Sequence, residues 1–459
     1  MKMDEYERVT KLKKGLNIRI SGKAKKVFGQ CDLPKLYALK PTDFHGLTPK
    51  MAVTEGDTVK IGTVLFFDKN HHEIKFVSPV SGTVKSINRG ERRQILEIVV
   101  ESDGKDTREP LNIPDIRELD EHSKLDKEQT AKILMDAGLW PLIRQRPYNI
   151  IANPSDTPKA IFISGFDTSP LAPDIDYILT GQEDFYHVGV SILLKLCNDI
   201  STSMPGRKFT RVCTSQRPLK FSRFAGPHPA GNVGVQIHHV SPLNKGEKVW
   251  VVRPQDVLLL GNLFLTGKLD FTRTIPLTGP SVINPVYYQY RLGASISELV
   301  KNNVKEGNLR YISGNILTGQ QIESDGYLGF YAPQVTVIPE GDKQEFLGWA
   351  LPGFGKFSVS RTYFSWLCRK RTYELNANIH GGRRAIVVSG EYDSVMPMDI
   401  LTEFLIKAIL AEDIEKMEQL GIYEVVEEDV ALCEYVCTSK LEIQSILRKG
   451  IELMIKEVG

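Results

Sequence analysis

Residues 51–67, MAVTEGDTVKIGTVLFF, and residues 76–90, FVSPVSGTVKSINRG, decide how the first part of this chain folds. Each stretch has short runs of β-branched and aromatic residues that glycines interrupt, at Gly56 and Gly62 in the first and at Gly82 in the second. Glycine adopts the backbone angles of tight turns at little cost, and short strands need such turns. The pattern therefore predicts a small all-β unit built from two halves.

The two halves resemble the biotinyl/lipoyl barrel-sandwich fold, through V-x-x-G-D-x-V-x-x-G in one and S-P-x-S-G-x-V in the other. In carrier domains of that fold, a lysine at the tip of a hairpin holds the cofactor. The corresponding tip here reads FFDKNHHEIKFVSP, but it is longer and contains neither M-K-M nor D-K-A. We expect Lys69 in this tip to be an unmodified structural residue, and a carrier lysine is the alternative that added mass on Lys69 would reveal.

The composition excludes several classes of protein. A chain of 459 residues exceeds one ordinary core, so we expect about three or four domains. Lys+Arg 58 against Asp+Glu 56 leaves a net charge of +2, which predicts no nucleic-acid partner. The polar start MKMDEYERVTKLKKG lacks the apolar region of a secretory signal, and the six cysteines are scattered. We therefore expect a reducing, cytoplasmic compartment and no membrane-spanning segment.

The next part of the chain alternates between strand and helix patterns. Residues 126–137, DKEQTAKILMDA, predict an amphipathic helix that Asp126 caps and Gly138 ends. Residues 159–166 predict a buried strand, and residues 185–200 are helical or mixed. The segments KFTRVCTS, at 208–215, and GNVGVQIHHV, at 231–240, predict further strands. Such alternation is typical of an α/β layer.

Residues 274–319 predict the order strand, Gly-Pro turn, strand, short helix, strand. This order resembles the soluble-ligand-binding β-grasp (SLBB-like) module, although the P-G step is missing because Val286 follows Pro285. The chain from about 397 is helical in pattern. The predicted fold class is thus α+β and multidomain. Its expected units are a barrel-sandwich domain with an N-terminal segment (1–110), an α/β Rossmann-like domain (111–260), a β-grasp domain with a β extension (261–380) and a C-terminal helical domain (381–459).

The sequence contains no strong motif for a dinucleotide site, a metal site or an iron–sulphur cluster. No G-x-G-x-x-G opens a helix after a strand, so a dinucleotide site has no local support. His238 and His239 are adjacent on a predicted strand and would point to opposite faces, which disfavours a shared metal. His228 lies in the Pro/Gly turn FAGPHPAG, for which a structural loop is favoured and the wall of a pocket is the alternative. Cys433 and Cys437 provide only two thiolates, too few for a ferredoxin-type cluster or a zinc site, so buried thiols are favoured.

Several stretches in the same order resemble the A subunit of the Na⁺-translocating NADH:quinone oxidoreductase (Na⁺-NQR). They include KKGLNIRISG, GLWPLIRQRPY, FDTSPLAP, GPHPAG, FLGWALPGFGKFSVSRTYF, YDSVMPMD and EEDVALCEYVC. The domain order is also similar, more distantly, to the flavin subunit of respiratory complex I and to the Rnf complex C subunit. Those relatives carry cluster cysteines near the C-terminus, so the resemblance implies that Cys433 and Cys437 are a cluster remnant without metal.

The resemblance also implies a place and a reaction. The family member is a peripheral subunit on the cytoplasmic side of the bacterial inner membrane. Its five partner subunits, chiefly a membrane-embedded flavin subunit, hold the flavins and the iron centres and act on NADH. The complex reduces ubiquinone or menaquinone and exports Na⁺, so quinone is the substrate implied here, and no covalently bound cofactor is expected on this chain.

Two stretches of the family are associated with quinone binding, and they match KPTDFHGL (residues 40–47) and IRQRPYNI (residues 143–150). A quinone needs apolar walls and donors for its two carbonyl oxygens. The residues that could form this site are the wall residues Phe44, Leu47, Pro147 and Tyr148, the donors His45, Arg144 and Arg146, and Gly46 between them. The family has a Glu-Glu pair where this chain has Thr42 and Asp43. The alternative is a non-catalytic scaffold subunit with no quinone site of its own.

Overall fold

The glycine-interrupted stretch folds into two small sheets that face each other. The computed structural model describes residues 9–113, 125–206, 219–341, 347–348, 350–368 and 370–458. The four-stranded sheet has the order β3 (Leu36–Leu39), β9 (Ile95–Ser102), β8 (Gly82–Arg89), β5 (Thr58–Val59), and the three-stranded sheet has the order β4 (Pro49–Met51), β6 (Val64–Asp68), β7 (Lys75–Val77). Gly56 and Gly62 adopt φ angles of 90° and 97° in the turns beside β5. The predicted strands and turns are therefore present.

Aromatic side chains fill the space inside this unit. Phe66 and Phe76 are fully buried and their rings stack at 4.5 Å between centroids. Lys69 follows β6 and is exposed in the loop to β7. Two short 3-10 helices accompany the strands: η2 (Pro41–Asp43) and η3 (Glu91–Arg93).

The second unit is a seven-stranded sheet. Its order is β1 (Val9–Lys11), β14 (Lys220–Ala225), β13 (Ile200–Pro205), β12 (Ile161–Ser164), β15 (Val249–Val251), β10 (Arg144–Arg146), β11 (Ile150–Ile151). The first five strands are parallel, and β10 and β11 join as antiparallel neighbours. The chain moves from β12 to β13 and β14 on one side and then returns to β15 on the other side of β12. The direction of winding therefore reverses between β12 and β15.

Helices cover both faces of this sheet. They are α1 (Lys127–Asp136), α2 (Ile175–Leu179), α3 (Glu183–Leu196), α4 (Val233–Val240) and α5 (Pro254–Thr266), with the 3-10 helix η5 (Trp140–Leu142) before β10. Asp126 caps α1 by accepting a hydrogen bond from Gln129 N, as its position predicts. Helices α3 and α5 approach closely because both present glycine. A Cβ on Gly261 would lie 1.7 Å from Phe185 O.

The predicted strand at 231–240 is wrong, because residues Val233–Val240 form helix α4. The β-branched composition misled the prediction, but this segment is the crossover between parallel strands β14 and β15, which needs a helix. On the helix, His238 contacts Glu424 at 2.7 Å and His239 packs at 6.1 Å from the Phe224 ring. The other strand prediction, at 208–215, lies outside the described residues.

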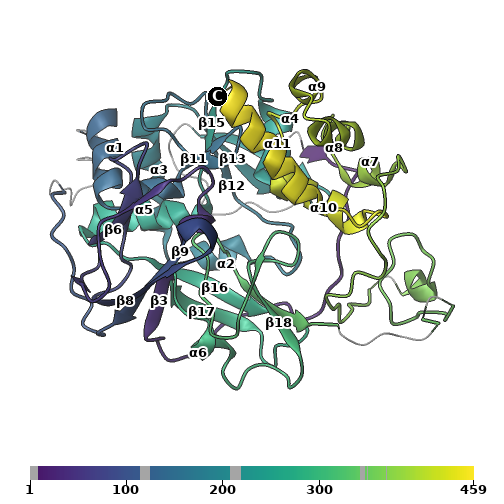
Figure 1. Ribbon diagram of the computed structural model, residues 1–459, viewed down its shortest axis with the longest axis horizontal. Coiled ribbons are helices and arrows are strands. Elements are labelled where there is room, and N and C mark those ends of the chain that lie inside the picture. Colours follow the sequence, from purple (N-terminus) through teal and green to yellow (C-terminus); the bar gives the residue numbers. More distant parts are fainter. Residues whose placement is uncertain are drawn as a thin grey trace.

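The third unit is a six-stranded sheet with the predicted β-grasp order. Its six strands are arranged β19 (Gln320–Ile322), β18 (Leu309–Ser313), β20 (Val335–Pro339), β16 (Thr272–Thr278), β17 (Val286–Arg291), β2 (Lys25–Phe28), and helix α6 (Ser297–Val300) follows β17. Strand, turn, strand, helix and strand thus follow one another as the sequence predicts. Figure 1 shows β16, β17 and β18 below the α/β unit in this view.

The C-terminal part is helical, as predicted. It contains α7 (Glu391–Val395), α8 (Thr402–Leu410), α9 (Ile414–Gln419), α10 (Glu427–Val436) and α11 (Ile443–Val458), and the 3-10 helix η6 (Phe364–Leu367) precedes them. These helices gather on one side of the molecule (Figure 1). Cys433 in α10 and Cys437 at its end are both fully buried among them. None of the described helices combines the length and the apolar character that a membrane crossing requires.

Candidate functional site

Strand β10 holds the two arginines of the second candidate stretch. Because side chains alternate along a strand, Arg144 and Arg146 point to one side and Gln145 to the other. Arg146 is only 3% exposed. Its Nη1 donates to Asp429 Oδ2 at 3.2 Å and its Nη2 donates to Glu428 Oε1 at 2.6 Å. Arg146 is therefore neither solvated nor free to donate to a ligand.

The acidic partners of Arg146 begin helix α10, where negative charge also complements the helix dipole. Burial alone would raise the pKa of Glu428, but the charges of Arg146 and Arg144 outweigh it and lower that pKa. Asp429 differs, because burial and then the charge of Glu428 raise its pKa to about 6. Gly234 in α4 makes room for this carboxylate, since a Cβ there would lie 2.4 Å from Asp429 Oδ2.

The two candidate stretches meet beside α10. His45 Nε2 lies 3.7 Å from Glu427 Oε1, and its side chain is 40% exposed. Partial burial and then the charge of Arg448 lower the pKa of His45. Arg448 in α11 donates from Nε to Glu427 and from Nη1 to Tyr148 O at 3.0 Å. We call Arg146, Glu427, Glu428, Asp429 and Arg448 the α10 junction.

Phe44 also connects the two candidate stretches, through aromatic contacts that lead by Tyr331 to Arg144. Phe44 is 4% exposed. The centroid of its ring lies 4.6 Å from that of Phe76, 4.8 Å from that of Phe330 and 5.6 Å from that of Tyr331. The Arg144 guanidinium lies over the Tyr331 ring, 5.0 Å from its centroid. Tyr331 also donates its hydroxyl to Pro141 O at 2.6 Å. Phe44 is thus a core residue between the barrel-sandwich and β-grasp sheets.

The four other candidate quinone-site residues, Gly46, Leu47, Pro147 and Tyr148, lie near the contact between the two stretches. Gly46 has a φ of 76°, and a Cβ there would lie 3.7 Å from Ile150 Cγ2, so this turn approaches the end of the second stretch. Leu47 is partly buried and packs on the main core. Pro147 is buried. Tyr148 packs its ring 6.2 Å from Tyr423, in the C-terminal helices.

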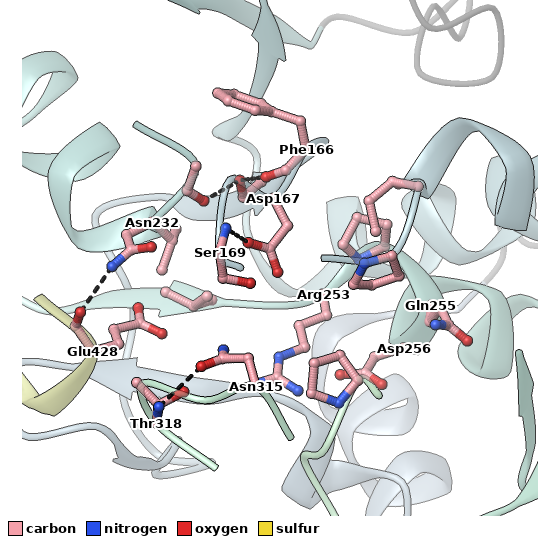
Figure 2. Close-up of a pocket in the computed structure, with 18 of the residues that line it drawn as sticks. Phe166, Asp167, Ser169, Asn232, Arg253, Gln255, Asp256, Asn315, Thr318 and Glu428 are labelled. Carbon is pink, nitrogen blue, oxygen red and sulfur yellow. Dashed lines mark hydrogen bonds between the residues drawn. The ribbon is translucent and has the colours of Figure 1, made fainter. Parts of the chain in front are cut away.

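A cavity of about 150 Å³ lies next to Arg144, at the carboxyl ends of β12 and β15. This is where the winding of the sheet reverses, which is the usual ligand position in open α/β sheets. Ser164 is the last residue of β12, Phe166 and Asp167 follow that strand, and Val252 and Arg253 follow β15. Figure 2 shows side chains from three units around this space, including Asn315 from the β-grasp loop and Glu428 from α10.

The cavity has apolar walls and several polar groups. Val251, Leu317 and Ala332 are among the apolar lining residues. Burial, and then the charge of Arg253, lower the pKa of Arg144 to about 10, still far above neutral pH. Burial raises the pKa of Asp167, whose side chain accepts a hydrogen bond from Ser169 N at 2.7 Å.

His228 also lines this cavity, so the turn FAGPHPAG forms part of a pocket wall, which was the alternative to the structural loop that the sequence favoured. The side chain is 3% exposed and lies 3.1 Å from Thr168 Oγ1 through Nδ1. Burial lowers the pKa of His228 to about 4, so the ring is neutral at neutral pH.

Of the residues around the cavity, the sequence pointed to Arg144 and His228 but not to most of the others. Tyr331, Arg253, Asp167, Glu428 and Asp429 were not singled out. For the last two a signal existed, because three consecutive acidic residues before an apolar helical pattern are typical of a helix start. For Tyr331 and Arg253 no local pattern gives a signal, since their roles depend on contacts between units.

Cys433 and Cys437 are buried thiols in the C-terminal helices. Burial raises the pKa of the Cys433 thiol to about 12, and Cys437 Sγ lies 2.9 Å from Tyr392 Oη. The prediction of buried thiols is thus confirmed. Within the described residues, no group of three or more His, Cys, Asp or Glu side chains is arranged to hold a metal ion.

Three family models match the chain. They are the NqrA N-terminal barrel-sandwich hybrid domain over residues 10–103, the NqrA second alpha/beta domain over residues 125–269, and the NQRA C-terminal domain, an SLBB model, over residues 274–324. These matches confirm the predicted barrel-sandwich, α/β and β-grasp units.

Relatives extend the similarity over nearly the whole chain. The A subunit of the Na(+)-translocating NADH-quinone reductase of Yersinia pestis bv. Antiqua is 38% identical over 441 residues, covering 95% of this chain and 97% of the relative. The corresponding protein of Pasteurella multocida is 37% identical over 461 residues, covering 97% and 99%. Among solved structures, an NAD+-reducing [NiFe]-hydrogenase in the air-oxidized state gives a TM-score of only 0.37, at 12% identity, over 72% of this chain and 61% of that one.

Proposed function

Because the chain belongs to the family of A subunits of the Na(+)-translocating NADH-quinone reductase, we propose that it contributes to quinone binding in that enzyme. It is one subunit of an oxidoreductase and acts together with partner subunits. In the proposed arrangement it lies at the cytoplasmic side of the membrane as a peripheral subunit. Five further subunits, chiefly a membrane-embedded flavin subunit, supply the electrons from NADH and the Na⁺ path.

The observation that carries the quinone proposal is the position of Arg144. This residue belongs to the second candidate stretch, and its side chain lines the cavity at the reversal point of the sheet. A cavity of about 150 Å³ has the size that admits a benzene-like ring, and it is too small for a dinucleotide. The head group of a quinone is such a ring, with two carbonyl oxygens.

The lining residues suit the chemistry of that ring. Guanidinium groups of Arg144 and Arg253 are donors for a carbonyl oxygen and stabilise the negative charge that reduction places on it. Val251 and Leu317 are apolar walls for the ring. Reduction of a quinone to a quinol takes up two electrons, from the partner subunits, and two protons. Asp167, with its raised pKa, is positioned to pass a proton into the cavity.

The test is a titration of the purified chain with a short-chain, water-soluble ubiquinone analogue. Calorimetry gives the Kd, and Trp250 fluorescence is a second readout, because this fully buried ring precedes the lining residue Val251 in β15. We expect saturable binding that Arg144→Gln weakens about 10- to 100-fold, as for loss of a charged hydrogen bond. Arg361→Gln, at an exposed position far along the chain, is the matched control and should bind as the wild type does.

The scaffold alternative makes a different prediction. It is supported by the engagement of Phe44 and Arg146 in contacts within the chain, which gives both residues a structural role. On that alternative, Arg144→Gln in an assembled complex has the quinone affinity of the wild type. The same result, together with no saturable binding to the isolated chain, would overturn the quinone proposal.

A further inference from the structure

The exposed apolar side chains of this protein are concentrated in one segment. Residues 347–388 carry ten of the twenty large hydrophobic side chains that are exposed among the described residues. They are Leu347, Leu351, Phe354, Val359, Phe364, Trp366, Leu367, Ile379, Val387 and Val388. Scattered exposed apolar residues need no explanation, but a concentration of this kind marks an interaction surface. We call residues 347–388 the extension.

The 3-10 helix η6 presents the most apolar part of the extension. Three of its four residues are exposed: Phe364 at 51%, Trp366 at 43% and Leu367 at 59%. The Phe354 ring lies 5.8 Å from Phe364, and Phe354 is itself 52% exposed. These aromatic rings stay outside the hydrophobic core although they contact one another.

The extension also holds a large share of the positive charge. Its sequence contains seven Lys or Arg and a single acidic residue, Glu374, which gives +6. The whole chain has +2, so everything outside the extension sums to −4. Glu374 is neutralised by Lys305, at 3.0 Å between Oε1 and Nζ. Arg361, Lys370 and Arg371 are exposed and form no ion pair with a carboxylate of the described residues.

Backbone contacts hold the extension to the body. Tyr373 is 3% exposed, donates its N–H to Arg19 O at 2.8 Å and accepts from Ser21 N at 2.9 Å. Further on, Arg384 N donates to Ser439 O at 2.9 Å. Residues 350–368 lie away from the four sheets, at the lower right of Figure 1. Arg371 Nη1 donates to Phe354 O at 3.2 Å, which places a basic group beside the exposed rings. We call these rings and the basic groups next to them the face of the extension.

We propose that this face lies on the surface of an anionic phospholipid bilayer. Exposed aromatic rings beside Lys and Arg are the composition of a membrane interface, where the rings enter the headgroup region and the cations pair with lipid phosphates. A protein with a complementary acidic surface is the other occupant that such a face could take, and binding to neither of the vesicles described below is the outcome that would favour it. The proposal rests on the peripheral placement given above and adds the surface by which the chain reaches the lipid.

Vesicle binding by the purified full chain tests the proposal without quinone, so its outcome is independent of the cavity. The chain is sedimented with vesicles of phosphatidylcholine alone and with vesicles containing one part phosphatidylglycerol to two parts phosphatidylcholine. We expect binding to the anionic vesicles that falls steeply with added salt. Binding to neither vesicle, or equal binding to both, overturns the proposal. Failure here while quinone binds normally would leave the cavity assignment intact.

Two variants assign the binding to the extension. Arg361→Gln with Lys370→Gln and Arg371→Gln should weaken partitioning onto anionic vesicles on the order of a hundredfold, since each basic residue near the surface contributes about tenfold or less. The matched control changes Lys11, Lys13 and Lys14 to Gln and should bind as the wild type does. Equal losses in both variants would mean that net charge alone causes the binding, and would overturn the assignment.

The apolar contribution has its own test. Phe364→Ser with Trp366→Ser and Leu367→Ser should reduce binding at least tenfold, whereas Leu33→Ser with Ile283→Ser, at positions 66% and 61% exposed elsewhere, should not. Trp366 also reports directly, because its emission should move to shorter wavelength on anionic vesicles. Trp366→Phe should remove that shift while vesicles still bind. A shift that persists in Trp366→Phe, or full binding after removal of the three side chains, contradicts the proposal.

Discussion

The α10 junction and the extension both depend on arginine, but they use its charge in opposite ways. At the junction, Arg146 is 3% exposed and bonded to Glu428 and Asp429. In the extension, Arg361 and Arg371 are exposed and lack carboxylate partners among the described residues. A buried charge must be paired inside the chain, whereas a surface charge gains little from a partner. The first set of arginines therefore specifies the fold, whereas the charges of the second set have no carboxylate partner among the described residues and are available to anionic groups outside the chain.

The largest effect is expected at Arg146. Arg146→Met leaves the buried Asp429 carboxylate and the partly buried Glu428 carboxylate without their cation, so the free energy of unfolding should fall by about 3–5 kcal/mol. Urea denaturation followed by tryptophan fluorescence measures the change. Arg361→Met is the matched substitution in the extension and should stay within about 0.5 kcal/mol of the wild type.

A triple variant tests whether the cost of Arg146→Met comes from the unpaired acidic charges. Arg146→Met with Glu428→Gln and Asp429→Asn removes the cation together with both charges, so it should recover most of the lost stability. If the single change Arg146→Met costs less than about 1 kcal/mol, the ion pairs of the α10 junction do not specify the fold.

A pH dependence is expected next. The pKa of Asp429 is raised to about 6, whereas an unfolded aspartate titrates near 3.9. Between these values the folded state keeps a proton that the unfolded state has lost, so this group's contribution to the free energy of unfolding falls as pH rises from about 4 to about 6. Asp429→Asn has no such group. Relative to the wild type, its stability should improve on the order of 2 kcal/mol from pH 4 to pH 7, and a difference that is flat with pH would contradict the assignment.

The cysteines give a smaller contrast between the same two regions. Cys433 is fully buried in α10, and Cys368 is exposed in the extension. Cys433→Ser places a hydroxyl among apolar groups and should cost about 1–3 kcal/mol. Cys368→Ser should cost no more than about 0.5 kcal/mol. Thermal unfolding of both variants measures the difference, and equal costs would mean that the C-terminal helices are not packed as described.

The smallest effect on stability is expected for the apolar face of the extension. Trp366→Ser removes a ring that is 43% exposed and should change the free energy of unfolding by no more than about 0.5 kcal/mol. Urea denaturation is again the measurement. A loss above about 2 kcal/mol would show that Trp366 supports the fold, and would weaken the case for an outward role.

Local patterns in the sequence predicted the elements that local physics controls. Gly56 and Gly62 mark turns because few other residues adopt their backbone angles. Asp126 marks the start of α1 because a carboxylate there satisfies a free N–H of the first turn. The prediction for residues 231–240 was wrong because their β-branched side chains favour a strand locally, whereas the topology requires a helix between β14 and β15.

The sequence by itself determined the type and order of most elements and the similarity to one family. Only the tertiary structure decided which candidate residues meet a ligand and which support the fold. Arg144 and Arg146 are two residues apart on one strand, yet one lines the cavity and the other bonds to Asp429, which is 283 positions away. Charge pairing and burial depend on distance in space, which no local pattern encodes. A side chain therefore acquires its role only when distant segments come together.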